Sequence, residues 1–234
     1  QYPGRLHVVN ANCGAPGPAR NAGASAARGE LLLFTDDDVI VPKDWVEKMV
    51  AGFDGHNGAA VCGGIAAVAM RSDVARYLHY RVMGSLGKAA GPINAAPMMN
   101  FIVSREAFTN IGGFLDARLR AAEDWEFCRR LRNSGVDIVF DPSVEVQHNY
   151  QTDMGPAQRR MREAGAAGVY IWMQHHRGAF LYTMYSLIRC ALSPFWIPFR
   201  YPIGLYALAV HMEYVFAEAR LIAYLRHLSG KSII

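Results

Sequence analysis

Acidic side chains stand directly after a short apolar segment near the start of the chain. Residues 31–34 are all apolar, and Asp36, Asp37 and Asp38 follow almost at once. An apolar run of this length is typical of a buried strand in a parallel sheet. Open α/β sheets place their ligand sites at the carboxyl ends of such strands. We therefore expect the three carboxylates to lie at a ligand-binding edge.

Three adjacent carboxylates repel one another unless a positive charge lies among them. A hard divalent cation with oxygen ligands, Mg²⁺ or Mn²⁺, is the simplest source of that charge. An isolated Asp triplet is more often a solvated acidic turn. The apolar strand that precedes this one favours the metal site.

Two further groups capable of acid–base or metal chemistry stand at the ends of predicted elements. Glu123 and Asp124 open a predicted helix, and His148 ends an alternating strand at residues 144–148. The two carboxylates could simply stabilise the helix dipole, and the histidine could be an ordinary half-buried side chain. A cation together with a separate carboxylate can displace a diphosphate leaving group, because the cation neutralises the leaving oxygens while the carboxylate accepts a proton.

The elements that would position these groups alternate between strand and helix. A strand at residues 6–9, a helix at 19–28 ended by Gly29 and the strand at 31–34 form the unit that builds a parallel sheet. Residues 71–99 fit either a helix or a glycine-rich loop. The other predicted elements are a helix after Pro42, strands at 59–70, 100–103 and 136–140, a turn at Asp141 and Pro142, and helices at 105–110 and from 123 to Gly135.

The composition narrows the class of protein. With 234 residues, 52% of them hydrophobic, the chain can bury a large core. No two of the four cysteines form a Cys-x-x-Cys pair, so we expect reduced thiols rather than disulfides or a zinc site. They are Cys13, Cys62, Cys128 and Cys190.

The excess positive charge lies in the C-terminal part of the chain. Residues 177–234 hold six basic and two acidic side chains, whereas residues 1–176 hold 18 of each. Basic residues along apolar helices suit an anionic membrane surface better than nucleic acid. Charged residues interrupt the apolar segments at 180–192 and 206–228, so we expect helices that lie in the membrane plane or pack together rather than span it.

Several stretches of the sequence, taken in chain order, resemble the later part of a glycosyltransferase family 2 domain with the GT-A fold. The resemblance covers residues 14–148, a little over half of the chain. The matching stretches are Gly17 to Gly23, Ala27 to Glu30 with Phe34 to Asp38, Asn100 to Arg105, Gly112 to Asp116, Glu123-Asp124 with Arg130 and Leu131, and Val146 to His148.

The resemblance implies a donor site at the acidic triplet. Asp36 and Asp38 match the Asp-x-Asp that binds the metal and the nucleotide-sugar diphosphate, and Asp37 lies between them. Arg20 matches an arginine against the nucleotide. His148 matches a histidine that in some members adds a ligand to the metal. The implied metal ligands are therefore Asp36, Asp38 and His148, holding Mg²⁺ or Mn²⁺.

The resemblance also implies the catalytic and acceptor groups. Asp124 matches the catalytic base of inverting members, and Glu123 stands beside it. Gly112, Gly113 and Phe114 match the turn that flanks the sugar and the acceptor.

Two departures from the family pattern affect these expectations. The family domain normally begins with a further half-Rossmann unit that binds the base and ribose, so the chain is expected to be a fragment with weakened nucleotide binding. Residues 158–161, Gln-Arg-Arg-Met, do not match the Gln-x-x-Arg-Trp motif of processive members. Transfer of a single sugar is therefore favoured over polymer synthesis.

The expected fold is α/β, with a GT-A, Rossmann-like, mixed but mainly parallel sheet flanked by helices and followed by an apolar helical segment. Residues 1–155 would form a partial GT-A domain, and residues 156–234 a helical, membrane-associated tail. The expected activity is inverting transfer from a nucleotide-diphospho-sugar to a hydroxyl of a lipid-linked or cell-envelope glycan, in the cytoplasm at the inner face of the membrane. The alternatives are a metal-dependent phosphohydrolase and a non-catalytic, membrane-associated remnant.

Overall fold

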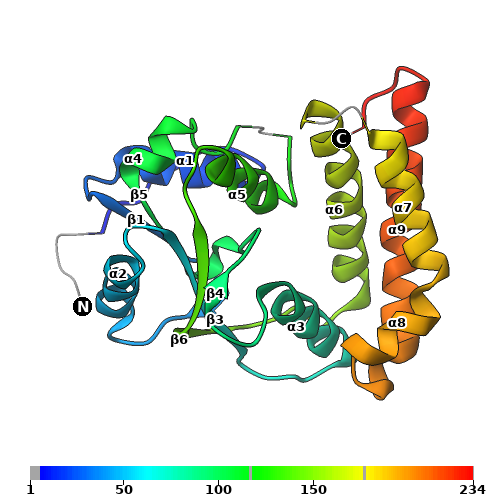
Figure 1. Cartoon of the computed structure of the whole chain (residues 1–234), viewed down its shortest axis with the longest axis horizontal. Helices are drawn as coiled ribbons and strands as arrows, with labels where there is room; N and C mark the ends of the chain where they lie inside the picture. The colour runs from blue at the N-terminus through cyan, green and yellow to red at the C-terminus, as the bar shows by residue number, and fades with distance from the viewer. Residues whose placement is uncertain (1–5, 116–117, 176–177, 234) are drawn as a thin grey trace. The chain divides into compact units, whose positions relative to one another are not determined.

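The computed structural model describes residues 6–115, 118–175 and 178–233. The chain forms two compact units (Figure 1). The sheet unit contains the described residues up to Asp36 together with Pro42–Gly64 and Ala89–Val144. The helical unit contains Asp37–Val41, Ile65–Lys88 and the described residues from Glu145 onward.

The strands of the described residues form one mixed six-stranded sheet in the order β1-β5-β3-β6-β2, with β4 pairing β6. The strands β3 and β6 begin in the sheet unit and end in the helical unit. The strands are β1 Leu31–Phe34, β2 Val39–Ile40, β3 Ala60–Ala67, β4 Gly91–Pro92, β5 Phe101–Ser104 and β6 Ile138–His148.

The expectation of a mainly parallel sheet is wrong. The pairs β1–β5, β3–β5, β2–β6 and β4–β6 are all antiparallel. Among the neighbouring strands of the described residues, β3 and β6 run parallel to each other, since Ala60 N donates to Asp137 O and, further along both strands, Val68 N donates to His148 O. The expected parallel partner of β1 is not formed: residues 6–9 are not in a strand, and Leu6 and Val8 are 85% and 89% exposed. The strand β1 pairs instead with β5, about 70 residues further along the chain.

Most of the predicted helices of the sheet unit are present. Helix α1 covers Pro16–Ala26 and begins earlier than expected, because Pro16 and Pro18 both lie in the first turn, where a missing N–H costs nothing. Helices α2 Trp45–Gly55, α4 Arg105–Asn110 and α5 Glu123–Asn133 follow the prediction closely. The predicted turn at Asp141 and Pro142 is wrong, since β6 continues through both residues.

Asn100, at the end of the short helix η1 Met98–Asn100, joins three elements of the core. Its Oδ1 accepts from Trp45 Nε1 of α2 at 2.9 Å, and its Nδ2 donates to Gly64 O at 2.9 Å and to Val144 O at 2.8 Å. Asn100 is fully buried, so these bonds cannot be replaced by solvent. A Cβ at Gly63 would lie 2.2 Å from Asn100 Nδ2, which explains the glycine there.

The helical unit resolves the ambiguous segment and contains the apolar tail. Residues 73–86 form helix α3 Asp73–Leu86, which is capped by the Ser72 side chain and ends at Gly87 with φ of 92°. The remaining helices are α6 Met154–His175, α7 Ala179–Ala191, α8 Ser193–Arg200, η2 Ile203–Leu205 and α9 Tyr206–Leu228. Helices α6 and α9 pack so closely at Gly165 that a Cβ there would lie 2.7 Å from Phe216 O.

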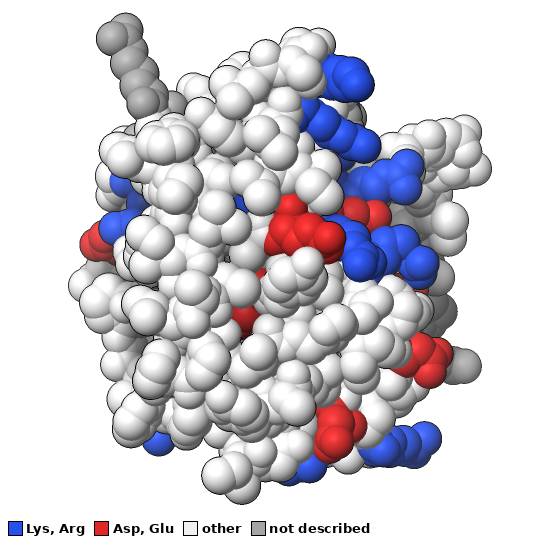
Figure 2. All heavy atoms as spheres, turned by 90° about the vertical axis from the view of Figure 1, so that its right-hand side faces the viewer, with Lys and Arg blue, Asp and Glu red and all other residues white. Residues whose placement is uncertain are grey.

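Helices α7 and α9 are apolar but do not form a membrane-crossing segment. Within the described ranges, no helix combines the length and the apolar character that crossing a membrane requires. Figure 2 shows the face of the molecule on the side of these helices, where most of the surface is uncharged and the charged side chains gather in small groups. Helix α9 packs against α6, α7 and α8, so the apolar tail expected from the sequence forms a helical bundle.

Replacing Asn100 with alanine should destabilise the fold strongly. The change leaves the Trp45 N–H and the carbonyls of Gly64 and Val144 buried and unpaired, at about 1–3 kcal/mol for each group. Urea denaturation should therefore show a loss of at least about 3 kcal/mol in the free energy of unfolding. Asn133→Ala, at an exposed asparagine at the end of α5, is the control. Equal stability of the two variants would contradict this role of Asn100.

Candidate functional site

Arg20 joins two of the predicted site carboxylates in the sheet unit. Its Nη2 donates to Asp36 Oδ1 at 2.8 Å, and its Nη1 donates to Glu123 Oε1 at 2.6 Å. Arg20 lies on α1, Asp36 follows β1, and Glu123 is the first residue of α5. The side chains of Arg20 and Glu123 are only 15% and 7% exposed. The structure thus brings together three residues that the sequence offered separately.

The charges of this cluster explain its arrangement. Burial alone would lower the pKa of Arg20, but attraction to Asp36 and Glu123 outweighs burial and raises the pKa above its ordinary value. The guanidinium is therefore fixed as a cation between two carboxylates. Because this one positive charge lies between two negative ones, it reduces the net negative charge of the cluster.

Glu123 and Asp124 have different environments although they are neighbours. Glu123 is buried and bound to Arg20. Asp124 is half-buried, and its Oδ1 accepts from the Trp125 N–H at 2.7 Å. The preceding Ala122 has φ of 63°, in the left-handed region that alanine rarely adopts, at the point where the chain enters α5. Glu123 is therefore held by Arg20, and the assignment of Asp124 as the base stays a prediction.

Asn21 fixes the turn that contains Gly112, Gly113 and Phe114. Its Oδ1 accepts from Phe114 N at 2.9 Å, and its Nδ2 donates to Phe114 O at 2.6 Å. Both glycines have positive φ, 76° and 63°, which favours glycine over other residues. A Cβ at Gly113 would also lie 2.6 Å from Asn21 Oδ1. The predicted turn residues are therefore held in one conformation by a side chain next to Arg20.

Arg130 holds the same turn from α5. Its Nη1 donates to Ile111 O at 2.6 Å and its Nη2 to Gly113 O at 2.7 Å, while Glu126 binds its other side at 2.6 and 2.7 Å. Asn21 and Arg130 belong to the matching stretches, but the sequence assigned neither of them a role. Their positions in the sequence could have indicated these roles, since Asn21 follows Arg20 and Arg130 lies on the helix that Glu123 begins.

Asp38 and His148 form a second pair, in the helical unit. His148 Nε2 lies 3.2 Å from Asp38 Oδ2, and Asn149 N donates to Asp38 O at 2.9 Å. The pairing of β2 with β6 places Val39 opposite His148, which explains the contact. The hydrogen bond from His148 lowers the pKa of Asp38, against the opposing effect of burial. The ring of His148 also meets Tyr150 edge-on, with centroids 4.2 Å apart.

The predicted metal ligands divide between these two pairs. Asp36 is bound to Arg20, Asp38 is bound to His148, and Asp37 is exposed. Among the residues that the structure describes, no group of three or more His, Cys, Asp or Glu side chains is arranged to hold a metal ion. The assignment of Asp36, Asp38 and His148 to a cation stays a prediction. Asp116 of the matching stretches lies outside the described residues.

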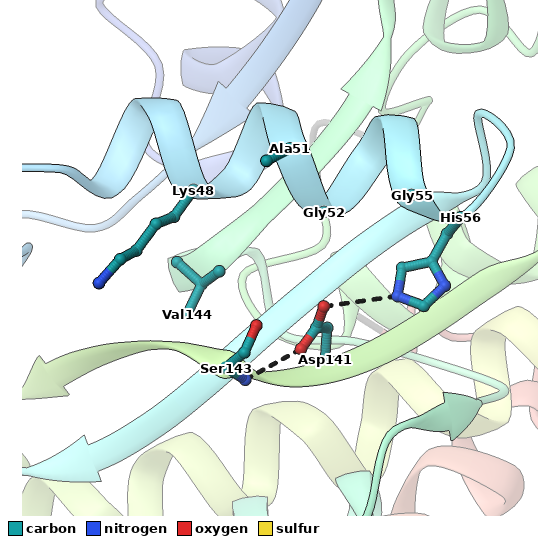
Figure 3. Close-up of a pocket in the computed structure, with 8 residues that line it drawn as sticks. All are labelled: Lys48, Ala51, Gly52, Gly55, His56, Asp141, Ser143 and Val144. Atoms are coloured by element: carbon teal, nitrogen blue, oxygen red, sulfur yellow. Dashed lines mark hydrogen bonds and ion pairs between the residues drawn. The ribbon is translucent and has the colours of Figure 1, made fainter.

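A pocket of about 390 Å³ lies where α2 faces β6 in the sheet unit (Figure 3). His56 Nε2 approaches Asp141 Oδ2 to 3.4 Å, and Asp141 Oδ1 accepts from Ser143 N at 2.9 Å. Lys48 and Val144 also line the pocket. None of the predicted site residues lines it, so this pocket is separate from the candidate site.

The comparisons with known proteins identify the family. Residues 1–113 match the family described as "Glycosyl transferase family 2". The resemblance to this family inferred from the sequence is therefore confirmed over these residues.

Curated relatives agree with this family. The chain is 26% identical over 167 residues to the pre-mycofactocin glycosyltransferase of Mycobacterium tuberculosis (strain CDC 1551 / Oshkosh), covering 68% of this chain and 35% of the relative. It is 23% identical over 157 residues to glycosyltransferase AglE of Haloferax volcanii, covering 66% of this chain and 51% of the relative. The chain thus spans about a third to a half of the length of these relatives.

Solved structures match at lower similarity. S. aureus TarS 1–349, crystallised with UDP-GlcNAc, has 16% identity and a TM-score of 0.48, covering 94% of this chain and 73% of TarS. GalNAc-T7, crystallised with UDP, GalNAc and Mn²⁺, has 17% identity and a TM-score of 0.46, covering 64% of this chain and 34% of GalNAc-T7.

Replacing Arg20 with methionine should weaken the site and the fold together. The change leaves Asp36 and the buried Glu123 without their shared cation, at a cost of about 1–3 kcal/mol in the free energy of unfolding. A double-mutant cycle with Glu123→Gln, followed by urea denaturation, isolates the interaction between the two side chains. Arg28→Met, at an exposed arginine beyond the end of α1, should have almost no effect. Additive effects in the cycle would mean that the ion pair contributes nothing.

The pair formed by His56 and Asp141 should make stability depend on pH. Burial alone would raise the pKa of Asp141, but hydrogen bonds from Ser143 and the contact with His56 lower it below the usual value of about 3.9. A lowered pKa gives stability that is present above the usual value and is lost as pH falls through the folded-state pKa. Asp141→Ala should therefore cost about 1 kcal/mol near pH 6, and the difference from wild type should shrink below about pH 4.

Urea denaturation across this pH range measures the effect. Asp137→Ala, at an exposed aspartate just before β6, is the control. A difference between wild type and Asp141→Ala that does not change with pH would show that the carboxylate charge plays no part.

Proposed function

We propose that the protein is an inverting glycosyltransferase that moves a sugar from a nucleotide-diphospho-sugar to a hydroxyl group. The observation that carries this proposal is the ion-pair cluster of Arg20, Asp36 and Glu123, which ties the end of β1 to the start of α5 beside Asp124. Two relatives that bear the name glycosyltransferase support it.

In the proposed reaction Asp124 acts as the base. Its carboxylate accepts the proton of the acceptor hydroxyl, whose oxygen then bonds to the anomeric carbon. The bond from that carbon to the diphosphate oxygen breaks on the opposite face, and the nucleotide diphosphate leaves with the electron pair. One displacement of this kind inverts the configuration at the anomeric carbon.

The neighbouring side chains position the reactants. Arg20 would lie against the nucleotide with Asp36 and Asp37. The turn of Gly112, Gly113 and Phe114, held by Asn21 and Arg130, would flank the sugar and the acceptor. The buried Glu123 holds Arg20 in place. These contacts would hold the reacting groups in place before the reaction, so that less conformational freedom is lost on reaching the transition state.

The donor types present suit a divalent cation. Carboxylate oxygens suit Mg²⁺, and a carboxylate with an imidazole nitrogen suits Mn²⁺, so we propose that Asp36, Asp38 and His148 hold one of these ions. Such a cation supplies stabilisation of the charge that develops on the departing diphosphate. The 3.2 Å contact between Asp38 Oδ2 and His148 Nε2 supports the choice of these two side chains as donors.

We further propose that the acceptor is a lipid-linked or cell-envelope glycan and that the protein works at the inner, cytoplasmic face of the membrane. The six basic residues among residues 177–234 and the apolar surface of the tail support this location. The mismatch of residues 158–161 to the motif of processive members favours transfer of one sugar.

Asp124→Asn should slow transfer strongly. Loss of a general base typically costs about 10²–10⁴-fold in rate. Transfer is measured with the complete protein, a set of nucleotide-sugars, Mg²⁺ or Mn²⁺ and a membrane extract as the source of acceptor. Asp137→Asn, the same change at an exposed carboxylate, should leave the rate unchanged.

The other outcomes separate the alternatives. Transfer that survives in Asp124→Asn would show that another group is the base. Release of free sugar or phosphate without a glycoside would indicate a phosphohydrolase. Absence of both activities, together with calorimetric titration showing no metal-dependent binding of nucleoside diphosphates, would indicate a non-catalytic remnant.

A further inference from the structure

Helix α7 of the helical unit is amphipathic in the reverse of the usual sense. In water, a helix normally turns its large apolar side chains toward the protein and its polar ones outward. Here the large apolar side chains point outward at helical spacing, and the pattern continues through α8 to η2. This outward stripe consists of Phe180, Leu181, Met184, Tyr185, Ile188, Leu192, Phe195, Phe199 and Ile203, which are 37–92% exposed.

The inward face of α7 is polar. Thr183 and Ser186 are 1% and 4% exposed. Ser186 Oγ accepts from Arg220 Nη1 of α9 at 2.9 Å, and Tyr182 Oη accepts from the other Nη of the same arginine. Burial, with repulsion from other arginines, lowers the pKa of Arg220 to about 10. The helix thus hides a charged group and presents its apolar groups to the surroundings.

A second charged group lies in the same interior. Glu213 of α9 is 5% exposed and lies 3.5 Å from Arg81 of α3 and 3.6 Å from Arg189 of α7. Burying charges and exposing aromatic side chains both oppose stability in water. The exposure of the apolar side chains becomes favourable when the outer surface meets an apolar medium. An exposed apolar surface of this extent marks an interaction site.

The dimensions of the stripe favour a lipid surface, with the helices lying along it. Helix α7 has 13 residues and is about 20 Å long, shorter than the roughly 30 Å of hydrocarbon in a bilayer. Helix α8 has only eight residues and contains Pro198. Side chains on one face of short helices reach the boundary between headgroups and acyl chains, the depth typical of in-plane helices.

The charges near the stripe indicate the kind of lipid. Arg189 and Arg200 belong to the same helices as the stripe, and the Arg189 guanidinium lies over the Trp196 ring at 4.3 Å. Of the five basic and two acidic side chains of residues 178–234, Arg220 and Glu213 are buried, which leaves four basic side chains against Glu218. Figure 2 shows that the surface on this side is mainly uncharged, with small groups of basic and acidic side chains. An apolar stripe with basic residues matches an anionic membrane surface.

We propose that the stripe of α7, α8 and η2 docks the protein in the plane of an anionic lipid bilayer. The proposal deepens the proposed membrane location, on which it rests, but it does not depend on the transfer reaction. The exposed aromatic residues of the stripe would enter the boundary between headgroups and acyl chains, while the basic residues meet lipid headgroups. These aromatic residues are Phe180, Tyr185, Phe195 and Phe199.

The test is vesicle flotation of the complete protein. Vesicles of phosphatidylcholine with about 30% phosphatidylglycerol are compared with vesicles of phosphatidylcholine alone. The wild type should float with the anionic vesicles and bind the neutral ones more weakly. The double change Phe195→Glu and Phe199→Glu should reduce the bound fraction at least about tenfold, because it removes two rings that would be buried in the bilayer.

The control is matched in exposure. Leu6→Glu with Val8→Glu changes two apolar residues outside the stripe that are 85% and 89% exposed, against 73% and 92% for Phe195 and Phe199. It should bind vesicles as the wild type does. Circular dichroism and thermal melting of both double variants establish that they fold.

Two results would overturn the proposal. One is equal vesicle binding by the wild type and by the stripe variant. The other is no vesicle binding by the wild type, with self-association that the stripe variant abolishes, which would make the stripe a contact between copies of the chain. Transfer to a soluble acceptor is measured in parallel: if the wild type binds vesicles but transfers nothing, the docking proposal stands and the proposed function fails.

Discussion

The sheet unit depends on one cation between two carboxylates. Arg20 contacts Asp36 and Glu123, and these three residues come from a helix, the end of a strand and the start of another helix. Attraction in a mostly buried site outweighs the cost of removing the guanidinium from water. The same ion pairs therefore set the relative positions of α1, β1 and α5 and keep Glu123 next to the candidate base Asp124.

The turn beside this cluster is fixed by polar side chains rather than by apolar packing alone. Asn21 satisfies both backbone groups of Phe114, and Arg130 satisfies the carbonyls of Ile111 and Gly113. Phe114 also stacks on Phe127 at 4.5 Å between centroids. A turn held at so many points has little conformational freedom left, which suits a segment that would have to orient a sugar.

The helical unit follows a different physical rule. In the sheet unit the apolar strands are buried, whereas α7 exposes large apolar residues and turns polar side chains toward the buried Arg220 and Glu213. Buried charges of this kind persist only where hydrogen bonds and ion pairs compensate them. The family resemblance does not cover this segment, so its role had to be inferred from burial and charge.

The sequence by itself determined the local elements and the family. Apolar runs and helix ends identified β1, α2, α4 and α5, because these signals depend on residues close together in the chain. It did not determine strand direction: β1 pairs antiparallel with β5, and β6 continues through Pro142. Nor did it show that Arg20 binds Glu123 rather than a nucleotide alone, or that α7 turns its apolar side outward. Those features depend on contacts between residues far apart in sequence, and only the tertiary structure decides which of the available partners meet.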